Sequence, residues 1–421
     1  MTMLENIIAR WPRFGNYLSL YLPLLSKTGQ LHFIRLLIGF ISYDGAKNLT
    51  GLNHATYDQR HLSSVCRFIG ESAWDEEEFE QLRYVDLNRR VRRYIESERA
   101  HGREPRLYLC IDDTNNPKRG EKAAGVSYQY SHLAGGLILC QCLVTAIIVI
   151  GDFAIPIEYK LYRRQSECED KKQAGEFISK TDLAKMLVEK FQPPTEDVIV
   201  YVVVDSWYTN EKLITTCQQR KFIFVGGLMS NRAIMLNGEQ TYQKVSEYAA
   251  KLSAKDYHSV TVGNQRWRVR GERVHLKGGL VGKVVFSHAP GFTAGNQTRY
   301  FFSTLSEVNP QWILSAYATR WGIECFHKAI KQLLGLSDNQ CMSTKSIRRL
   351  MVLAMIAYSY LLIEQVENKD AYYIRKGETL PTMAQVQREH KLQFHQAMIA
   401  WAYQQAQNGI PLDNLLQKIA A

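Results

Sequence analysis

The segment from Tyr317 to Lys331, YATRWGIECFHKAIK, combines one carboxylate with two cations and a phenol at helical spacing. Tyr317, Arg320, Glu324 and Lys331 follow one another at offsets of three, four and seven residues. On an α-helix these four side chains lie within about 60° of one another, on one face. The opposite face is apolar, which predicts an amphipathic helix with its back in a core. Taken alone, the polar face also fits an ordinary solvated helix with an Arg320–Glu324 ion pair.

Two further carboxylates stand where predicted strands end. The apolar run Leu107–Ile111 predicts a strand that leads into Asp112. The run Val198–Val204 predicts a buried strand that stops at Asp205. An aspartate that closes one strand is usually a turn former or a helix cap. Two such strands followed by a helix with Glu324 predict instead that the three carboxylates meet.

Three convergent carboxylates suit hard divalent cations such as Mg²⁺ or Mn²⁺, which prefer oxygen ligands. Two such ions can bridge a phosphodiester, one activating the attacking oxygen and the other stabilising the leaving oxygen. Tyr317, Arg320 and Lys331 would then hold flanking phosphates, for which the planar fork of arginine is well suited. The pattern therefore predicts strand chemistry on nucleic acid.

The composition agrees with a polyanionic partner. Lys and Arg outnumber Asp and Glu by 52 to 41, a formal charge of +11, and 46% of the 421 residues are hydrophobic, enough for a large core. The eight cysteines form no CxxC pair, which favours neither a zinc site nor a disulfide framework. The N-terminus lacks the apolar region of a signal peptide, and the longest apolar runs have about fourteen residues, short for a bilayer. We expect a soluble, intracellular protein without a membrane partner.

The chain divides into five predicted regions. The pattern of residues 1–103 predicts a helical, DNA-binding domain, because residues 49–72 have a helix–turn–helix rhythm with Arg60, His61 and Arg67 available for phosphates. An ordinary helical bundle fits this stretch as well. The remaining regions are a catalytic core over 104–228, a β-rich insertion over 229–300, the second part of the core over 301–363 and a helical C-terminal region over 364–421.

The core reads as a mixed α/β arrangement. Its predicted elements are strands Leu107–Asp112, Leu137–Ile150 and Ala154–Leu161, a helix over 172–191, a strand over 198–204, a helix over 210–220 and a strand Phe222–Val225.

This order of elements, with the motif Y-(2)-R-(3)-E-(6)-K met by Tyr317, Arg320, Glu324 and Lys331, resembles the DDE transposases of bacterial insertion sequences. The resemblance covers roughly residues 106 to 362. The stretch DDTNNPKRG is similar to the acidic first motif of one branch of these enzymes, which continues to a lysine and a glycine. The resemblance implies a ribonuclease H-like core with a β-rich insertion and helical domains at both ends.

Carried over residue by residue, the resemblance implies that Asp112, Asp205 and Glu324 bind two Mg²⁺ or Mn²⁺ ions. Such enzymes cleave each transposon end and direct the freed 3′-hydroxyl at a target. It also implies phosphate contacts for Tyr317, Arg320 and Lys331, and a lesser one for Lys118, whose alternative is a plain solvated turn. Trp321 is expected either to stack on a displaced base or to pack against the helix edge.

The first metal ligand is a choice between two neighbours. Asp112 and Asp113 point to opposite sides of a strand, so only one can face the metals. We choose Asp112, where the D-x-T pattern usual for this motif starts.

Two other functions fit parts of the pattern. A ribonuclease H-like nuclease without strand transfer would share the metal triad, and a domesticated transposase would keep only DNA binding. An ATP-driven enzyme does not fit, because GGLVGKV at 278–284 is one residue short of a phosphate-binding loop and lacks its Ser or Thr. The transposase interpretation implies double-stranded DNA as partner, both terminal repeats and target, a homodimer on DNA, and a cytoplasmic, nucleoid-associated bacterial protein.

Overall fold

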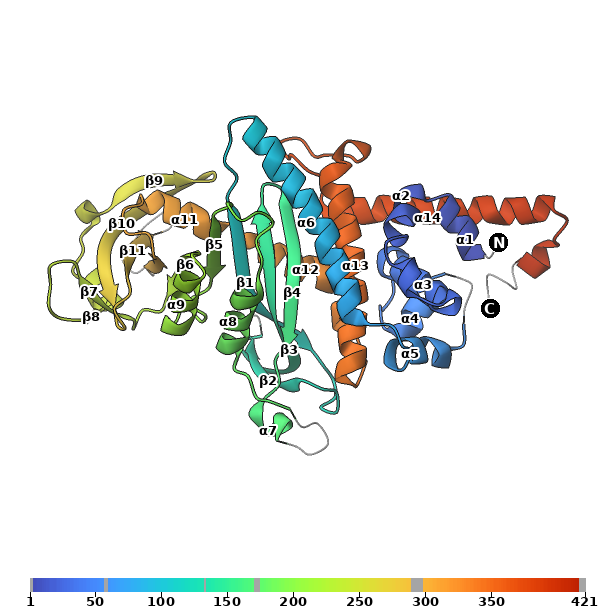
Figure 1. The fold of residues 1–421 in the computed structure, drawn as a ribbon, viewed down its shortest axis with the longest axis horizontal. Helices are drawn as coiled ribbons and strands as arrows, with labels where there is room; N and C mark the ends of the chain where they lie inside the picture. The colour runs from blue at the N-terminus through green and yellow to red at the C-terminus, as the bar shows by residue number, and fades with distance from the viewer. Residues whose placement is uncertain (1–2, 57–59, 132–133, 170–174, 289–297, 416–421) are drawn as a thin grey trace.

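The computed structural model describes residues 3–56, 60–131, 134–169, 175–288 and 298–415. It is a mixed α/β protein in which one large sheet is flanked by helices from both ends of the chain (Figure 1). The predicted fold class, a ribonuclease H-like mixed sheet with a β-rich part and helical ends, is confirmed.

The region before the first strand is helical. Its elements are α1 (Met3–Ala9), α2 (Pro12–Leu18), the 3-10 helix η1 (Leu22–Leu24), α3 (Lys27–Ser42), α4 (Leu49–His54), α5 (Leu62–Gly70) and α6 (Glu76–Ala100). The short helices α4 and α5 match the predicted rhythm, although residues 57–59 between them lie outside the described residues. Helix α6 begins after Asp75, whose carboxylate accepts a hydrogen bond from the Glu77 backbone N–H at 2.8 Å. This cap satisfies one of the unpaired N–H groups of the first turn.

The strands of the described chain form a single mixed sheet. They are β1 (Leu107–Pro117), β2 (Val126–Ser131), β3 (Gly136–Ile150), β4 (Phe153–Leu161), β5 (Val200–Val204), β6 (Ile223–Leu228), β7 (Ala233–Leu236), β8 (Gln243–Lys244), β9 (His258–Val262), β10 (Gln265–Leu276), β11 (Val281–His288) and β12 (Arg299–Ser303). Their order is β2-β3-β1-β5-β6-β12-β11-β10-β7-β8, with β4 paired to β3 and β9 to β10. The strands of the β-rich region therefore continue the core sheet through β12; residues 289–297 lie outside the described residues.

The pairing of β1 sets the position of both aspartates. β1 runs antiparallel to β3 and parallel to β5, with Ile111 opposite Val204. Asp112 and Asp205 are the next residues of these two strands, so they lie side by side at one end of the parallel pair. β1 does not end at Asp112 as predicted, because its pairing with β3 continues as far as Pro117.

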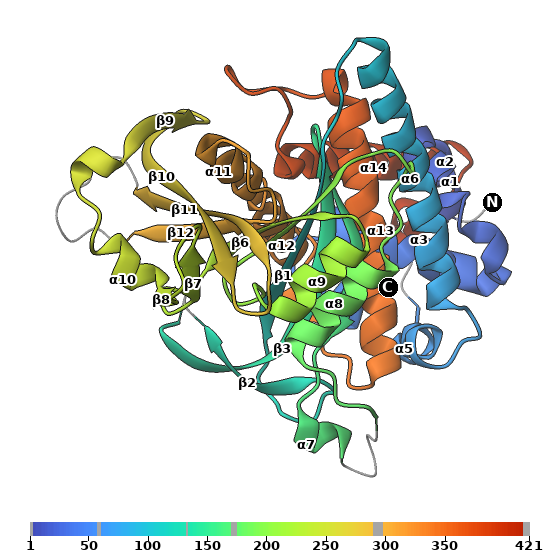
Figure 2. The same ribbon diagram turned by 60° about the vertical axis from the view of Figure 1, so that its left-hand side comes forward.

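Helices cover both faces of the sheet. The remaining helical elements are α7 (Gln165–Cys168), α8 (Lys180–Lys190), α9 (Glu211–Gln219), α10 (Val245–Ala249), η2 (Ala254–Asp256), α11 (Pro310–Ala318), α12 (Trp321–Gln332), η3 (Leu336–Asp338), α13 (Thr344–Glu367), η4 (Lys369–Ala371) and α14 (Met383–Gln407). Helices α8 and α9 lie on one face of the core strands, and α12 and α13 lie on the other (Figure 2).

Two of the predicted helices differ in extent. The helix predicted over 172–191 begins only at Lys180, after the N-cap Ser179, and residues 172–174 lie outside the described residues. The helix predicted from Tyr317 to Lys331 is two helices, α11 and α12, joined through Arg320. At this junction Gly322 N–H donates to Thr319 O and Ile323 N–H to Arg320 O, both at 3.0 Å, a tighter 3-10 turn. The angles of one straight helix therefore do not apply to Tyr317.

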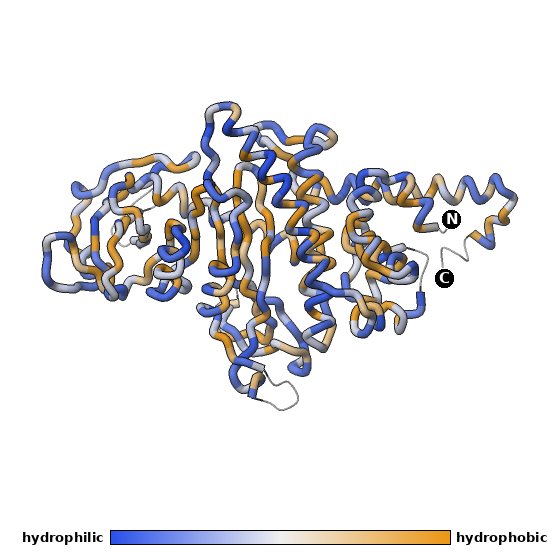
Figure 3. Tube along the Cα trace, in the orientation of Figure 1, coloured by the Kyte–Doolittle hydropathy of each residue, from blue (hydrophilic) through white to orange (hydrophobic). Residues whose placement is uncertain are grey.

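Helix α13 forms the centre of the core. Its length and composition would suffice to cross a membrane, but 89% of its apolar stretch is buried inside the protein. It packs against α3 and α6 on one side and β4 on the other. Figure 3 shows hydrophobic residues concentrated along the central strands, whereas α6 is largely hydrophilic. Burial of this kind is typical of the core helix of a large domain.

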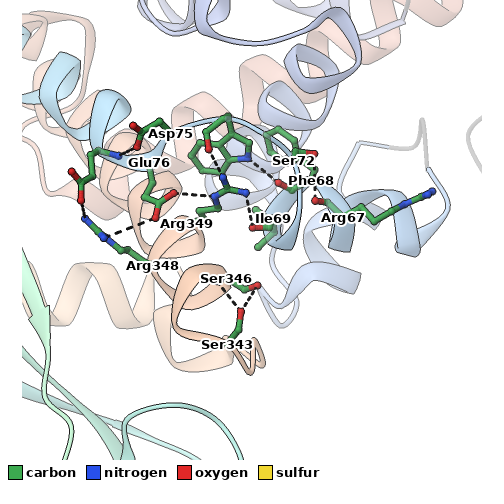
Figure 4. Close-up of polar contacts among 12 residues, drawn as sticks. Arg67, Phe68, Ile69, Ser72, Asp75, Glu76, Ser343, Ser346, Arg348 and Arg349 are labelled. Atoms are coloured by element: carbon green, nitrogen blue, oxygen red, sulfur yellow. Dashed lines mark hydrogen bonds and ion pairs between the residues drawn. The ribbon is translucent and has the colours of Figure 1, made fainter. Parts of the chain in front are cut away.

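A buried arginine fastens α13 to the N-terminal helices (Figure 4). The Arg349 guanidinium lies 4.5 Å from the centroid of the Trp74 ring and pairs with Glu76 at 3.0 Å. It also donates to the backbone carbonyls of Ile69, at 3.2 Å, and of Trp74. The neighbouring Arg348 pairs with Glu77 at the surface. Both arginines therefore pair with a glutamate, but the side chain of Arg349 is buried and that of Arg348 is exposed.

We expect Arg349→Ala to lower the free energy of unfolding by about 3 kcal/mol or more, because it leaves two buried carbonyls without their donor and Glu76 with only Arg348, 4.0 Å away. Its side chain is 2% exposed, whereas that of Arg348 is 46% exposed. Arg348→Ala is the matched control and should cost about 1 kcal/mol or less. Urea denaturation of both variants measures the difference. Equal losses would contradict a structural role for Arg349.

Candidate active site

Asp112 and Asp205 form the sheet side of the candidate site. The Asp112 side chain accepts a hydrogen bond from the Asp113 backbone N–H at 2.9 Å. Asp205 Oδ1 accepts from the backbone N–H groups of Trp207 and Tyr208 at 2.9 and 3.1 Å, so it closes the turn that leaves β5. Asp205 is therefore a turn former, as strand-end aspartates usually are, and also a neighbour of Asp112.

Arg320 joins the sheet to the helix that carries Glu324. Its Nη1 donates to Asp112 Oδ2 at 2.5 Å, and its Nη2 donates to Glu324 Oε1. The guanidinium thus lies between the two carboxylates. The structure brings Asp112, Asp205, Arg320 and Glu324 together from three elements that are far apart in the sequence.

Burial and like charges make the Asp112 carboxylate costly to ionise. Its pKa is raised to about 7, chiefly by burial and also by the nearby Asp205 and Asp113, while Arg320 acts against the rise. Burial also raises the pKa of Asp205, opposed by the N–H of Tyr208 and by Arg320. Carboxylates in such surroundings are stabilised by added positive charge.

Asp113 faces the other side of the sheet. Its Oδ2 pairs with Lys180 Nζ of α8 at 2.7 Å and accepts from Cys142 Sγ at 3.0 Å. Burial would raise the pKa of Asp113, but the charge and hydrogen bond of Lys180 outweigh it and lower the pKa. This geometry supports the choice of Asp112 as the residue that faces Glu324.

Of the other predicted site residues, Tyr317 and Trp321 lie next to Arg320, whereas Lys331 and Lys118 lie farther along the chain direction of β1. Tyr317 lies beside Arg320, whose guanidinium carbon is 5.7 Å from the ring centroid, and Trp321 is 67% exposed next to it. Lys331 Nζ donates to Asn115 O at 2.7 Å, three residues beyond Asp112 on β1. Lys118 lies six residues beyond Asp112, roughly 20 Å along an extended strand, and its ammonium donates to Asn339 O. Its contact with phosphate stays a prediction.

His327 was not predicted from the sequence. The Thr145 hydroxyl donates to Asp112 O at 3.1 Å and lies 2.7 Å from His327 Nε2. The hydroxyl proton goes to the carbonyl, so His327 Nε2 carries the proton of the second bond. Burial lowers the pKa of His327 to about 3, which keeps the ring neutral. The sequence signal that could have identified His327 is its position one helical turn after Glu324.

The donor set fits a hard divalent cation, although the side chains are not arranged around one. Among the described residues, no three His, Cys, Asp or Glu side chains are grouped closely enough to hold a metal ion. Arg320 supplies the positive charge between Asp112 and Glu324 instead. Carboxylate oxygens that share one cation in this way are the ligands that Mg²⁺ and Mn²⁺ prefer.

We expect Asp112→Asn to weaken Mn²⁺ binding far more than Asp113→Asn, because only Asp112 faces Arg320 and Glu324. The two variants remove the same charge from adjacent positions and so control for each other. Electron paramagnetic resonance titration of free Mn²⁺ gives both affinities without any DNA. A larger loss in Asp113→Asn would identify Asp113 as the ligand.

Comparisons with known proteins identify the family of this chain. The family model of the DDE superfamily endonucleases matches residues 21–268, more than half of the chain, including Asp112 and Asp205 and ending before Glu324. The chain is also 24% identical over 305 residues to a probable transposase for insertion sequence element IS701 from Microchaete diplosiphon, covering 70% of this chain and 69% of that protein. The chain therefore belongs to the DDE superfamily of endonucleases, which confirms the family resemblance seen in its residues.

Proposed function

We propose that this chain is a DNA transposase that cleaves the ends of an insertion sequence with divalent metal ions and joins the freed ends to target DNA. The observation that carries this proposal is the meeting of Asp112 and Asp205, on adjacent parallel strands, with Glu324 through Arg320. The relative described as a probable transposase supports it. Two Mg²⁺ or Mn²⁺ ions held by the three carboxylates would activate the attacking oxygen and stabilise the leaving one.

The side chains around the carboxylates have separate proposed roles. Arg320 turns from Asp112 and Glu324 to a DNA phosphate when the carboxylates bind metal, because its charge is then no longer needed between them. Tyr317 and Lys331 hold flanking phosphates, and the exposed Trp321 stacks on a displaced base. His327 keeps the backbone of Asp112 in place through Thr145.

DNA binding away from the cleavage point is proposed for the N-terminal helices. Arg60, His61 and Arg67 are exposed on and just before α5. The proposed division is a DNA-binding domain over 1–103, a core over 104–228 and 301–363, an insertion over 229–300 and a C-terminal region over 364–421. Because two transposon ends must be joined, we propose a homodimer on DNA, acting in the bacterial cytoplasm at the nucleoid.

We expect Glu324→Gln to abolish strand cleavage while DNA binding stays nearly intact, because it removes the charge of a proposed metal ligand at constant side-chain size. It also weakens the ion pair with Arg320, whose own charge remains available for phosphate. The loss should exceed the roughly 10–100-fold typical of residues that only support a ligand. Glu307→Gln, a surface carboxylate paired with Arg273, is the control and should cleave normally. The assay incubates the protein with DNA carrying the flanking ends of its own locus, with Mg²⁺ or with EDTA.

The same assay separates the proposal from its alternatives. Metal-dependent nicks at the repeat boundary, followed by joining to a second DNA, are the expected result. Cleavage without joining or end preference would indicate a nuclease, and binding without cleavage would indicate a domesticated DNA-binding protein. Normal cleavage by Glu324→Gln would refute the carboxylate assignment.

We expect Arg320→Ala to weaken binding of a DNA end that includes the cleavage site. Losing one phosphate contact lowers the slope of log affinity against log salt by about 0.9. Arg348→Ala, a surface arginine paired with Glu77, should leave that slope unchanged. Fluorescence anisotropy at several salt concentrations measures both variants, and an unchanged slope in Arg320→Ala would exclude the phosphate contact.

A further inference from the structure

Helix α14 has an apolar surface on two opposite sides. One side, with Phe394, Met398 and Trp401, is buried against α1, α3 and α13. The other side is exposed: Leu392, Ile399 and Tyr403 are 48%, 70% and 66% exposed. At about 100° per residue these three point roughly 180° away from the buried side. A helix that is apolar on both sides normally packs on both.

The exposed residues of α14 have the spacing of a helix-packing seam. Leu392, Gln396, Ile399, Tyr403 and Ala406 are all exposed and follow one another at steps of four, three, four and three. Alternate steps of three and four place side chains along one line that a second helix can meet. We call these five residues the α14 seam.

The α14 seam carries no formal charge. From Leu392 to Gln407 the helix contains no Asp, Glu, Lys or Arg, in a chain whose formal charge is +11. DNA binds through cationic side chains, and helices that lie on membranes carry Lys and Arg on their polar side. Neither partner fits the seam. Two copies of a cationic chain, however, repel each other least where they meet through an uncharged surface.

We infer that the α14 seam is an interface with α14 of a second copy of this chain, the two helices running antiparallel about a two-fold axis. The inference rests on the proposed function in one respect, that the second copy holds the other transposon end. Pairing between the two lines of the seam sets Leu392 against Tyr403 of the other copy and Gln396 against Ile399 of the other copy. Such an interface is self-complementary, as two-fold symmetry requires.

Charge favours the antiparallel orientation. Arg388 is exposed and lies one helical turn before the seam. In a parallel pair it would lie beside Arg388 of the other copy, and like charges would repel. In the antiparallel register it lies beside Gln407 of the other copy. Lys391 does not enter this comparison, because it pairs with Asp44 of its own chain.

The position and size of the seam predict a weak interface that leaves the carboxylates open. In Figure 1, α14 runs past α1 at the end of the molecule opposite the β-rich strands. A seam of 15 residues is roughly 22 Å long. One helix pair of that length buries less than the roughly 1,200 Å² of a stable interface, so we expect a dissociation constant on the order of micromolar or weaker.

Sedimentation velocity of the full chain without DNA, from about 1 to about 100 µM, tests the interface directly, in the range where such a contact assembles. Wild type should shift from monomer to dimer, and Ile399→Glu should raise the dimer dissociation constant at least about tenfold. Tyr373→Glu, at an exposed aromatic outside α14, is the matched control and should dimerise like wild type. Circular dichroism melting checks that both variants fold. A monomeric wild type throughout, or no effect of Ile399→Glu, would overturn the inference.

Cysteine pairing tests the orientation. In a background with the exposed Cys66 and Cys325 changed to Ser, Leu392→Cys chains mixed with Tyr403→Cys chains should form a disulfide-linked dimer. Each variant alone should stay unlinked, because neither position meets itself in the antiparallel register. Self-linked dimers of each variant would overturn the antiparallel arrangement. These readouts need no cleavage, so a chain that dimerises through α14 but never cuts DNA would contradict the proposed function alone.

Discussion

The ion pairs of Arg320 with Asp112 and Glu324 are the contact on which the arrangement of the site depends. Parallel pairing of β1 with β5 forces Asp112 and Asp205 side by side, and burial raises the pKa of Asp112 to about 7. Two neighbouring carboxylates with a third opposite them repel one another unless a cation lies between. Arg320 is that cation, and it draws the helix with Glu324 towards the sheet. Under the proposed function, divalent cations would meet the same electrostatic demand.

The helix that carries Glu324 is held in place from its far end. Lys47, nearly fully buried, donates to the last carbonyls of two helices, Phe40 O of α3 at 2.6 Å and Leu333 O of α12. Gln387 of α14 donates to the same Leu333 carbonyl at 3.0 Å. Burial lowers the pKa of Lys47 to about 8, which means that burial disfavours its charged form. The two helix C-termini offset this effect, because the C-terminal end of a helix favours a cation. The N-terminal and C-terminal helices thus fix the angle at which α12 meets the carboxylates.

The sequence predicts the chemical groups of the site better than their detailed geometry. Apolar runs that end in Asp112 and Asp205 mark two strand ends, and the β3 strand at Gly136–Ile150 matches the predicted run almost residue for residue. The edge strand β2 was missed, although VSYQYS alternates between apolar or aromatic and polar residues as a strand does. Which of Asp112 and Asp113 faces Glu324 is seen from the ion pair of Asp113 with Lys180. The backbone of Asp112 is supported by Thr145, which in turn contacts His327. The helix break at Arg320 depends on packing between α11 and β5, β6 and β12. Contacts between residues so far apart leave no local pattern.

Charge is distributed so that two kinds of contact stay separate. The exposed arginines on and just before α5 suit a polyanion, and screening limits their reach to about 10 Å at 0.1 M salt. The α14 seam carries no charge, so it neither attracts DNA nor repels a second copy. An interface of this kind loses little strength when salt rises, whereas every phosphate contact weakens. High salt should therefore release DNA from the protein before it separates two copies that meet through α14.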